Sequence, residues 1–176
     1  MKRLVDILGE AAGLRTSGRT MDALQRVQEW LRIAPLRAND YELCGRFVSD
    51  MVRAGPATES FPTVSVAVMG TCTTSNIAHA VRTMLLQEGF MADVYEAEYG
   101  VYRQEIMDPE SRLYQRPRDM VLLASGTRGM PELVAALNEP GRGAETMSHI
   151  ERDFRVCWET HGKCTTLINL CGVNRL

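Results

Sequence analysis

The sequence contains little that points to a membrane or to export. No apolar run approaches the roughly 20 residues that a helix needs to cross a bilayer. Lys2 and Arg3 begin the chain with positive charge. The stretch that follows is interrupted by Asp6, Gly9 and Glu10, which argues against a cleavable secretion signal. We therefore expect a cytoplasmic protein with no membrane partner.

Basic charge is not in excess. The 20 Lys and Arg residues face 22 Asp and Glu residues, which gives a formal net charge of −2. A nucleic-acid-binding arm needs a clear basic surplus, so we expect no nucleic-acid partner. With 45% hydrophobic and 24% charged residues over 176 positions, the composition is typical of a folded domain, alone or with an appendage.

Three common motifs of phosphate chemistry are missing. The sequence has no G-x-x-x-x-G-K-[ST] loop, no G-x-G-x-x-G after a predicted strand and no D-x-D-x-[TV]. Nucleotide hydrolysis and aspartate-based phosphatase chemistry therefore have no support in these residues. We expect no cofactor.

Cysteines are few and odd in number, which favours free thiols in a reducing compartment. The five are Cys44, Cys72, Cys157, Cys164 and Cys171. Cys157 and His161 share a predicted helix face at i, i+4, and Cys164 follows a glycine turn. Structural zinc sites usually have paired short cysteine spacings, however, and Cys171 lies beyond a whole predicted strand. We expect no metal site.

Apolar periodicity predicts a helical N-terminal segment over residues 1–53. A second helix begins near Thr20 and ends before Pro35, and a third covers Tyr41 to Val52. Residues 54–62 contain two prolines and one glycine and are typical of a linker. The first helix has an apolar stripe at i, i+3, i+4, i+7 and i+8, formed by Leu4, Ile7, Leu8, Ala11 and Ala12.

After Pro62 the pattern changes to strands that alternate with helices, over residues 63–176. Such alternation implies an α/β fold with a parallel, doubly wound sheet of about four strands. So thin a sheet indicates a fragment or a strand supplied from elsewhere, and we expect it to be marginal or to form a homo-oligomer. The predicted strands cover 63–69, 92–97, 120–125 and 165–170. One predicted helix follows the first strand and its turn and ends near Glu88, and a mostly helical stretch over 102–114 is interrupted at Asp108-Pro109. Two further helices are predicted over 131–137 and 144–161.

The turn after the first predicted strand is the expected ligand site, because ligands of open α/β sheets bind beyond the carboxyl ends of the strands. Gly70 allows a sharp turn, and the next amides lie at a helix N-terminus, which favours a phosphate or a developing oxyanion. The alternative is that Thr74 or Ser75 only caps the helix. The expected ligand-binding residues are Gly70, Thr71, Thr73, Thr74, Ser75, Asn76, Glu96 at the end of the second strand and Gly126 after the third.

Cys72 is the candidate catalytic residue in this turn. A thiol near a helix N-terminus has its thiolate stabilised and becomes a better nucleophile. It still needs a base, and His79 lies about two helical turns away, too far for contact within one helix. The alternative is a small thiol that fills space.

Three blocks of the sequence resemble the N-terminal domain of FkbH-like proteins. They run from Val66 to Thr74, from Tyr99 to Tyr114 and from Arg118 to Ala124. The middle block, with Tyr-Arg-Gln-Glu-Ile, Asp-Pro, Ser and Leu-Tyr in order, is the most specific.

The resemblance implies a flavodoxin-like, three-layer domain similar to SGNH hydrolases, which is joined in this family to a haloacid-dehalogenase-type domain. The family loads a glyceryl unit on an acyl carrier protein for polyketide biosynthesis, and the second domain supplies the aspartate chemistry and its magnesium. Cys72 stands where SGNH enzymes have their serine. The Gly-x-Asn-Asp and Asp-x-x-His blocks of those enzymes have no counterpart here, so the resemblance leaves esterase activity without support.

These observations lead to three hypotheses. The first is a module that recognises an acyl carrier protein or acyl thioester, or that serves a haloacid-dehalogenase-type partner. The second is an acyltransferase or thioesterase that depends on Cys72. The third is a scaffold, in which residues 1–53 form a dimer or dock a partner.

Overall fold

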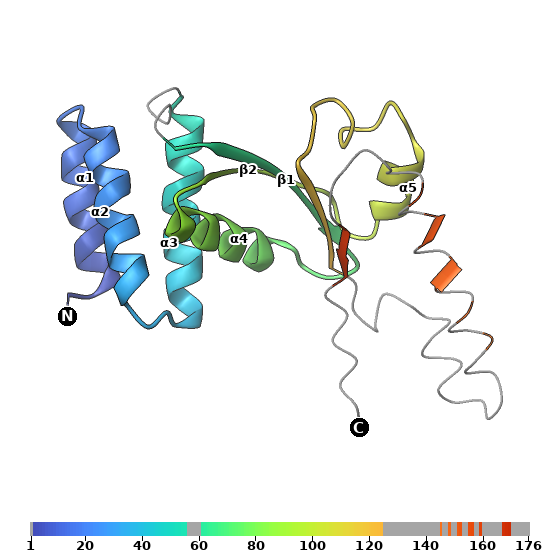
Figure 1. Ribbon diagram of the computed structural model, residues 1–176, viewed down its shortest axis with the longest axis horizontal. Helices are drawn as coiled ribbons and strands as arrows, with labels where there is room; N and C mark the ends of the chain where they lie inside the picture. The colour runs from blue at the N-terminus through green and yellow to red at the C-terminus, as the bar shows by residue number, and fades with distance from the viewer. Residues whose placement is uncertain are drawn as a thin grey trace. The chain divides into compact units, whose positions relative to one another are not determined.

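The computed structural model describes residues 2–55, 61–124 and 167–169, together with 145, 148, 151–152, 155–156 and 159. An α/β chain with a helical N-terminus and parallel strands is confirmed (Figure 1). The elements are α1 (Leu4–Thr16), α2 (Thr20–Ile33), α3 (Ala38–Arg53), β1 (Thr63–Gly70), α4 (Ser75–Glu88), β2 (Met91–Glu96), α5 (Tyr102–Met107), β3 (Met120–Ala124) and β4 (Leu167–Asn169).

The chain divides into two compact units that do not follow its order. The helical unit consists of residues 1–64 and 75–94, and the sheet unit consists of residues 65–74 and 95–176. Helix α4 and most of β2 therefore belong to the same unit as α1 to α3. The predicted division into a helical segment, a linker and an α/β domain stays a prediction.

Each of the first three helices begins with an arginine three residues before an aspartate. In α3 the Arg37 N–H donates to Asp40 Oδ2 at 2.8 Å, and in α1 the Arg3 N–H donates to Asp6 Oδ2 at 3.3 Å. An acidic side chain in the first turn also complements the helix dipole. The hydrogen bond from the Arg3 side chain lowers the pKa of Asp6.

The core of the helical unit joins residues from all four helices and from β2. Leu24 and Leu31 of α2, Leu86 of α4 and Met91 of β2 are fully buried in it. Figure 1 shows α1, α2 and α3 side by side, and α4 packs against α2 and α3. Apolar burial of this kind is the main force that holds the unit together.

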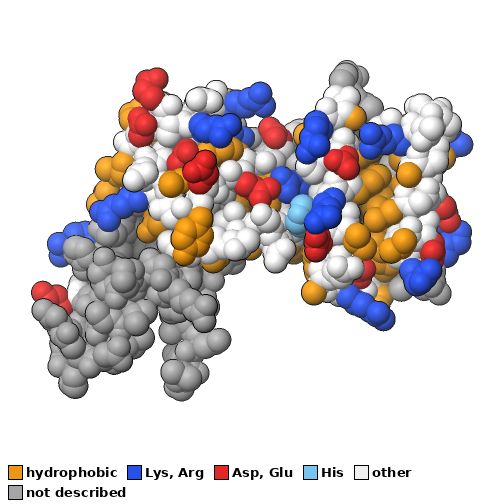
Figure 2. Space-filling view, turned by 180° about the vertical axis from the view of Figure 1, so that it is seen from behind, with side chains coloured by type: hydrophobic (Ala, Val, Ile, Leu, Met, Phe, Trp, Pro, Cys, Tyr) orange, Lys and Arg blue, Asp and Glu red, His pale blue; other side chains and the backbone are white. Residues whose placement is uncertain are grey.

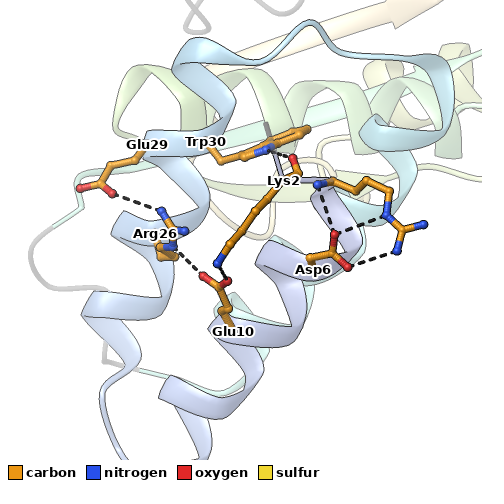
Figure 3. A network of polar contacts seen from close by, with 7 residues as sticks. Lys2, Asp6, Glu10, Arg26, Glu29 and Trp30 are labelled. Carbon is orange, nitrogen blue, oxygen red and sulfur yellow. Dashed lines mark hydrogen bonds and ion pairs between the residues drawn. The ribbon is translucent and has the colours of Figure 1, made fainter.

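A polar network at the start of the chain fixes α1 to α2 (Figure 3). The indole Nε1–H of Trp30 donates to the backbone oxygen of Lys2 at 2.8 Å. Glu10 accepts from Arg26 at 2.9 Å and pairs with Lys2. These two cations lower the pKa of Glu10, the Lys2 hydrogen bond contributing most.

Helices α3 and α4 approach each other closely at Gly45. A Cβ at this position would lie 2.5 Å from His79 Cα, so no larger residue fits. The Thr83 hydroxyl donates to the Tyr41 carbonyl at 3.1 Å across the same contact. Burial here raises the pKa of the neighbouring Cys44 thiol to about 12.

The strands form one sheet in the order β2-β1-β3-β4. Strands β1 and β3 are parallel, in a register that pairs Val66 with Met120 and Gly70 with Ala124. Strand β4, three residues long, pairs in parallel with β3. The valine-rich interior of β1 is fully buried, as is typical of parallel sheets.

The interruption expected at Asp108-Pro109 in the helical stretch 102–114 is confirmed, but the residues after it form turns and not a helix. Helix α5 ends at Met107, because Pro109 cannot donate to an earlier carbonyl and Asp108 Oδ1 instead accepts the Glu110 N–H at 3.0 Å. The third helix is longer than predicted and begins at Ala38. The helix expected over 131–137 lies outside the described residues.

Candidate functional site at the end of strand β1

The candidate site lies where β1 ends, next to the last residue of β3. Gly70 is required here by space, because a Cβ would lie 1.7 Å from the carbonyl oxygen of Ala124. That same oxygen accepts the Thr71 N–H at 3.0 Å. The close contact fixes the direction in which the chain leaves the sheet.

The loop after β2 lies against the other side of this strand end. The Ala97 N–H donates to the Val68 carbonyl at 3.1 Å, and the Gly100 N–H donates to the Gly70 carbonyl at 3.0 Å. Gly100 has a φ of +76°, which glycine adopts without strain. Gly70 is therefore held between Ala124 and Gly100.

Cys72 is half-buried in the turn, and in the described part of the chain its thiol has one hydrogen-bond partner, the Ala124 oxygen at 3.6 Å. His149 and His161 lie outside the described residues. A nucleophilic role for Cys72 stays a prediction.

The other predicted ligand residues differ in their exposure. Thr71 and Thr74 are buried, Thr73 is exposed, and Glu96 is half-buried at the end of β2. Gly126 lies outside the described residues. Of these four residues, Thr73 is the exposed one.

Ser75 and Asn76 are both exposed and begin α4, which belongs to the helical unit. Asn76 lines a hollow of that unit, together with Ala38, Asn39, Tyr41, Glu42 and Ala80. The capping role expected for Thr74 or Ser75 stays a prediction.

In the loop after β2, sequence reasoning missed Tyr99 as a site residue, whereas Glu98 was an open candidate for a carboxylate of the site. Tyr99 is 68% exposed beside Gly100, and Glu98 is also exposed. In the sequence, the pair Tyr99-Gly100 is the signal that marks this turn. The loop adds an aromatic ring and a carboxylate to the groups near the end of β1.

Glu105 organises the block that carried the family resemblance. Its two carboxylate oxygens accept the Tyr95 hydroxyl at 2.9 Å and the Leu113 N–H at 3.0 Å. The Ser111 hydroxyl donates to the Glu105 carbonyl at 2.6 Å. Burial, and then the Glu105 carboxylate, raise the pKa of Tyr95 to about 12. The guanidinium of Arg118 lies 5.0 Å from the Tyr95 ring centre.

Neither a metal centre nor a membrane span is found among the described residues. They contain no group of three or more His, Cys, Asp or Glu side chains arranged to hold a metal. Cys157, Cys164 and Cys171 lie outside them. No helix in the described part of the chain is long and apolar enough to cross a bilayer.

A known family matches the larger part of the chain. The family described as the FkbH N-terminal domain matches residues 65–167, which is more than half of the sequence. The chain belongs to the FkbH N-terminal domain family. Its matched region includes the end of β1, the Tyr99 loop and the Glu105 network.

One solved structure supports the fold. It is the crystal structure of the N-terminal part of protein BF1531 from Bacteroides fragilis, which contains a phosphatase domain complexed with Mg. The two chains are 20% identical with a TM-score of 0.58, and the match covers 77% of this chain and 33% of that one. This FkbH-family chain therefore spans about a third of its structural neighbour. No curated protein matches the sequence.

Proposed function

We propose that this chain is a recognition module for an acyl carrier protein or its acyl thioester, related to glyceryl loading in polyketide biosynthesis. The observation that carries the proposal is the family match over residues 65–167. In this proposal the module is cytoplasmic, and the chemistry belongs to a haloacid-dehalogenase-type partner domain. Thr73, Cys72 and the Tyr99 loop form the contact surface.

The strand order supports a flavodoxin-like, SGNH-like arrangement for this domain. The order β2-β1-β3-β4 is the beginning of the order 2-1-3-4-5 that is typical of flavodoxin-like folds. In such sheets the strand order reverses between β1 and β3, and ligands bind beyond the carboxyl ends of those two strands. Gly70 and Ala124 mark that position here.

Binding to a carrier protein tests the proposal. A purified carrier protein is titrated by calorimetry in its glyceryl-loaded and unloaded forms. Thr73→Arg places a bulky charge on the proposed surface, and we expect it to weaken binding roughly tenfold or more. The matched control is Thr63→Arg, an exposed threonine at the first position of β1. No binding by the wild type, or equal loss in both variants, would contradict the proposal.

A scaffold is the second candidate function, because α1 has an outward face without charge. Val5 is 59% exposed there, and Gly9, Ala12 and Gly13 are exposed on the same face. Figure 2 shows hydrophobic side chains gathered on the helical unit, while basic and acidic side chains are mixed on the visible face. Light scattering of the wild type and of Val5→Glu tests this function. A monomeric wild type would exclude self-association.

A further inference from the structure

Residues 95–105 form a closed loop in the sheet unit, tied at its base by a side-chain bond. Tyr95 in β2 and Glu105 in α5 are the first and last residues of this loop, and the Tyr95 hydroxyl donates to Glu105 Oε1 at 2.9 Å. At the start of α5, the Glu105 N–H also donates to the Val101 carbonyl at 3.0 Å. The Arg118 guanidinium, over the Tyr95 ring, also donates to the Ser65 hydroxyl at 3.1 Å.

The middle of this loop is the part that touches the end of β1. The Ala97 N–H and the Gly100 N–H donate to the Val68 and Gly70 carbonyls. Cys72 follows Gly70 by two residues and is half-buried. The loop is therefore bonded to the strand that ends two residues before Cys72.

We propose that Glu105 is a positioning residue, which closes the 95–105 loop through Tyr95 and thereby holds it against the end of β1. The inference rests on the proposed function for the identity of the site, and its test needs no carrier protein. A carboxylate suits this role because its second oxygen is bound at the same time to the Leu113 N–H. Loss of the carboxylate removes both the hydrogen bond from Tyr95 and the one from Leu113.

Alkylation of individual cysteines measures the effect in the full chain. The protein is treated with iodoacetamide, and the modification of each cysteine is followed by peptide mass spectrometry. In Glu105→Ala we expect Cys72 to react roughly tenfold faster. Loss of one hydrogen bond to a charged group shifts the equilibrium between the closed and the open loop by about this factor. Tyr95→Phe should act in the same direction. Cys44, which is buried in the helical unit, reports unfolding of that unit.

Two further variants separate positioning from general weakening. Glu105→Gln keeps an acceptor oxygen and adds a donor that reaches the Tyr95 hydroxyl, so it should restore the slow reaction of Cys72. Tyr114→Phe removes the hydroxyl that donates to the Ile106 carbonyl at 2.7 Å, outside the tie, and should leave Cys72 unchanged.

The result that would overturn the inference is a Cys72 rate that stays at the wild-type value in both Glu105→Ala and Tyr95→Phe. An equal increase in Tyr114→Phe would overturn it as well. If Glu105→Ala fails to fold, Tyr95→Phe and Glu105→Gln decide the outcome. Should the wild type bind no carrier protein, the proposed function fails while the alkylation result still stands.

Discussion

Gly70 is the position at which a single methyl group should disturb the sheet unit most. An added Cβ would lie 1.7 Å from the Ala124 oxygen and 2.6 Å from its carbonyl carbon, and a backbone cannot rotate away as a side chain can. Gly70→Ala must therefore push β1 and β3 apart. Forced overpacking costs about 1–3 kcal/mol, and loss of the Thr71–Ala124 hydrogen bond adds about 0.5–1.5 kcal/mol. We expect a total destabilisation of about 1.5–4.5 kcal/mol.

The chain supplies matched controls for this substitution. Gly9 and Gly13 lie inside α1, and a Cβ at either position meets nothing within 4 Å. Gly9→Ala and Gly13→Ala should each stabilise the fold by about 0.5–1 kcal/mol, because alanine loses less backbone entropy in a helix. Gly100→Ala also has free space, but its φ of +76° should cost about 1–2 kcal/mol.

Urea denaturation followed by circular dichroism measures the free energy of unfolding of all four variants. We expect Gly9→Ala and Gly13→Ala to be more stable than the wild type, Gly100→Ala to be less stable, and Gly70→Ala to be the least stable. It is refuted if Gly70→Ala unfolds within about 0.5 kcal/mol of the wild type, the usual range for a neutral surface change.

Three further predictions concern the helical unit. Burial raises the pKa of Cys44 in the folded protein from 9.0 to about 12. The unfolded chain therefore loses the thiol proton first, and the folded state loses stability as the pH rises from 9 toward 12, by about 1.4 kcal/mol per pH unit more in the wild type than in Cys44→Ala. An equal pH dependence of the free energy of unfolding in the two proteins would contradict this. Asp40→Ala removes the acceptor of the Arg37 N–H and should lower the free energy of unfolding by about 0.5–1 kcal/mol. An unchanged thermal melting curve would count against a stabilising role for this hydrogen bond. Leu86→Ala opens a cavity in a fully buried core and should cost about 2–5 kcal/mol by urea denaturation, and a cost near zero would show that Leu86 is not packed as described.

Local pattern was sufficient to predict most of the elements. The apolar stripe of α1 and the valine run of β1 have one physical interpretation each, because a helix and a buried strand bury residues at different periods. The end of α5 at Met107 agrees with the interruption predicted at Asp108-Pro109, whereas the helical pattern after Pro109 forms no helix. Packing of α4 with α2 and α3 could not be predicted, because it depends on contacts between residues far apart in the chain.

The candidate site shows the same limit. Gly70 was expected as a turn residue, but its close contact with Ala124 follows from the register of two strands that are 50 residues apart in sequence. The buried state of Thr71 and Thr74 likewise depends on the packed fold. Glu105 lies in the block most specific to the family, yet its bonds to Tyr95 and Leu113 are visible only in three dimensions.

Intact-mass spectrometry with a loaded carrier protein tests the central proposal most directly. Wild type and Cys72→Ala are each incubated with glyceryl-loaded and acyl-loaded carrier protein, and the complex is measured in parallel under native conditions. A recognition module should form a non-covalent complex with both variants and gain no mass itself. A covalent adduct on the wild type that is absent from Cys72→Ala would contradict this account and make Cys72 the site of acyl transfer.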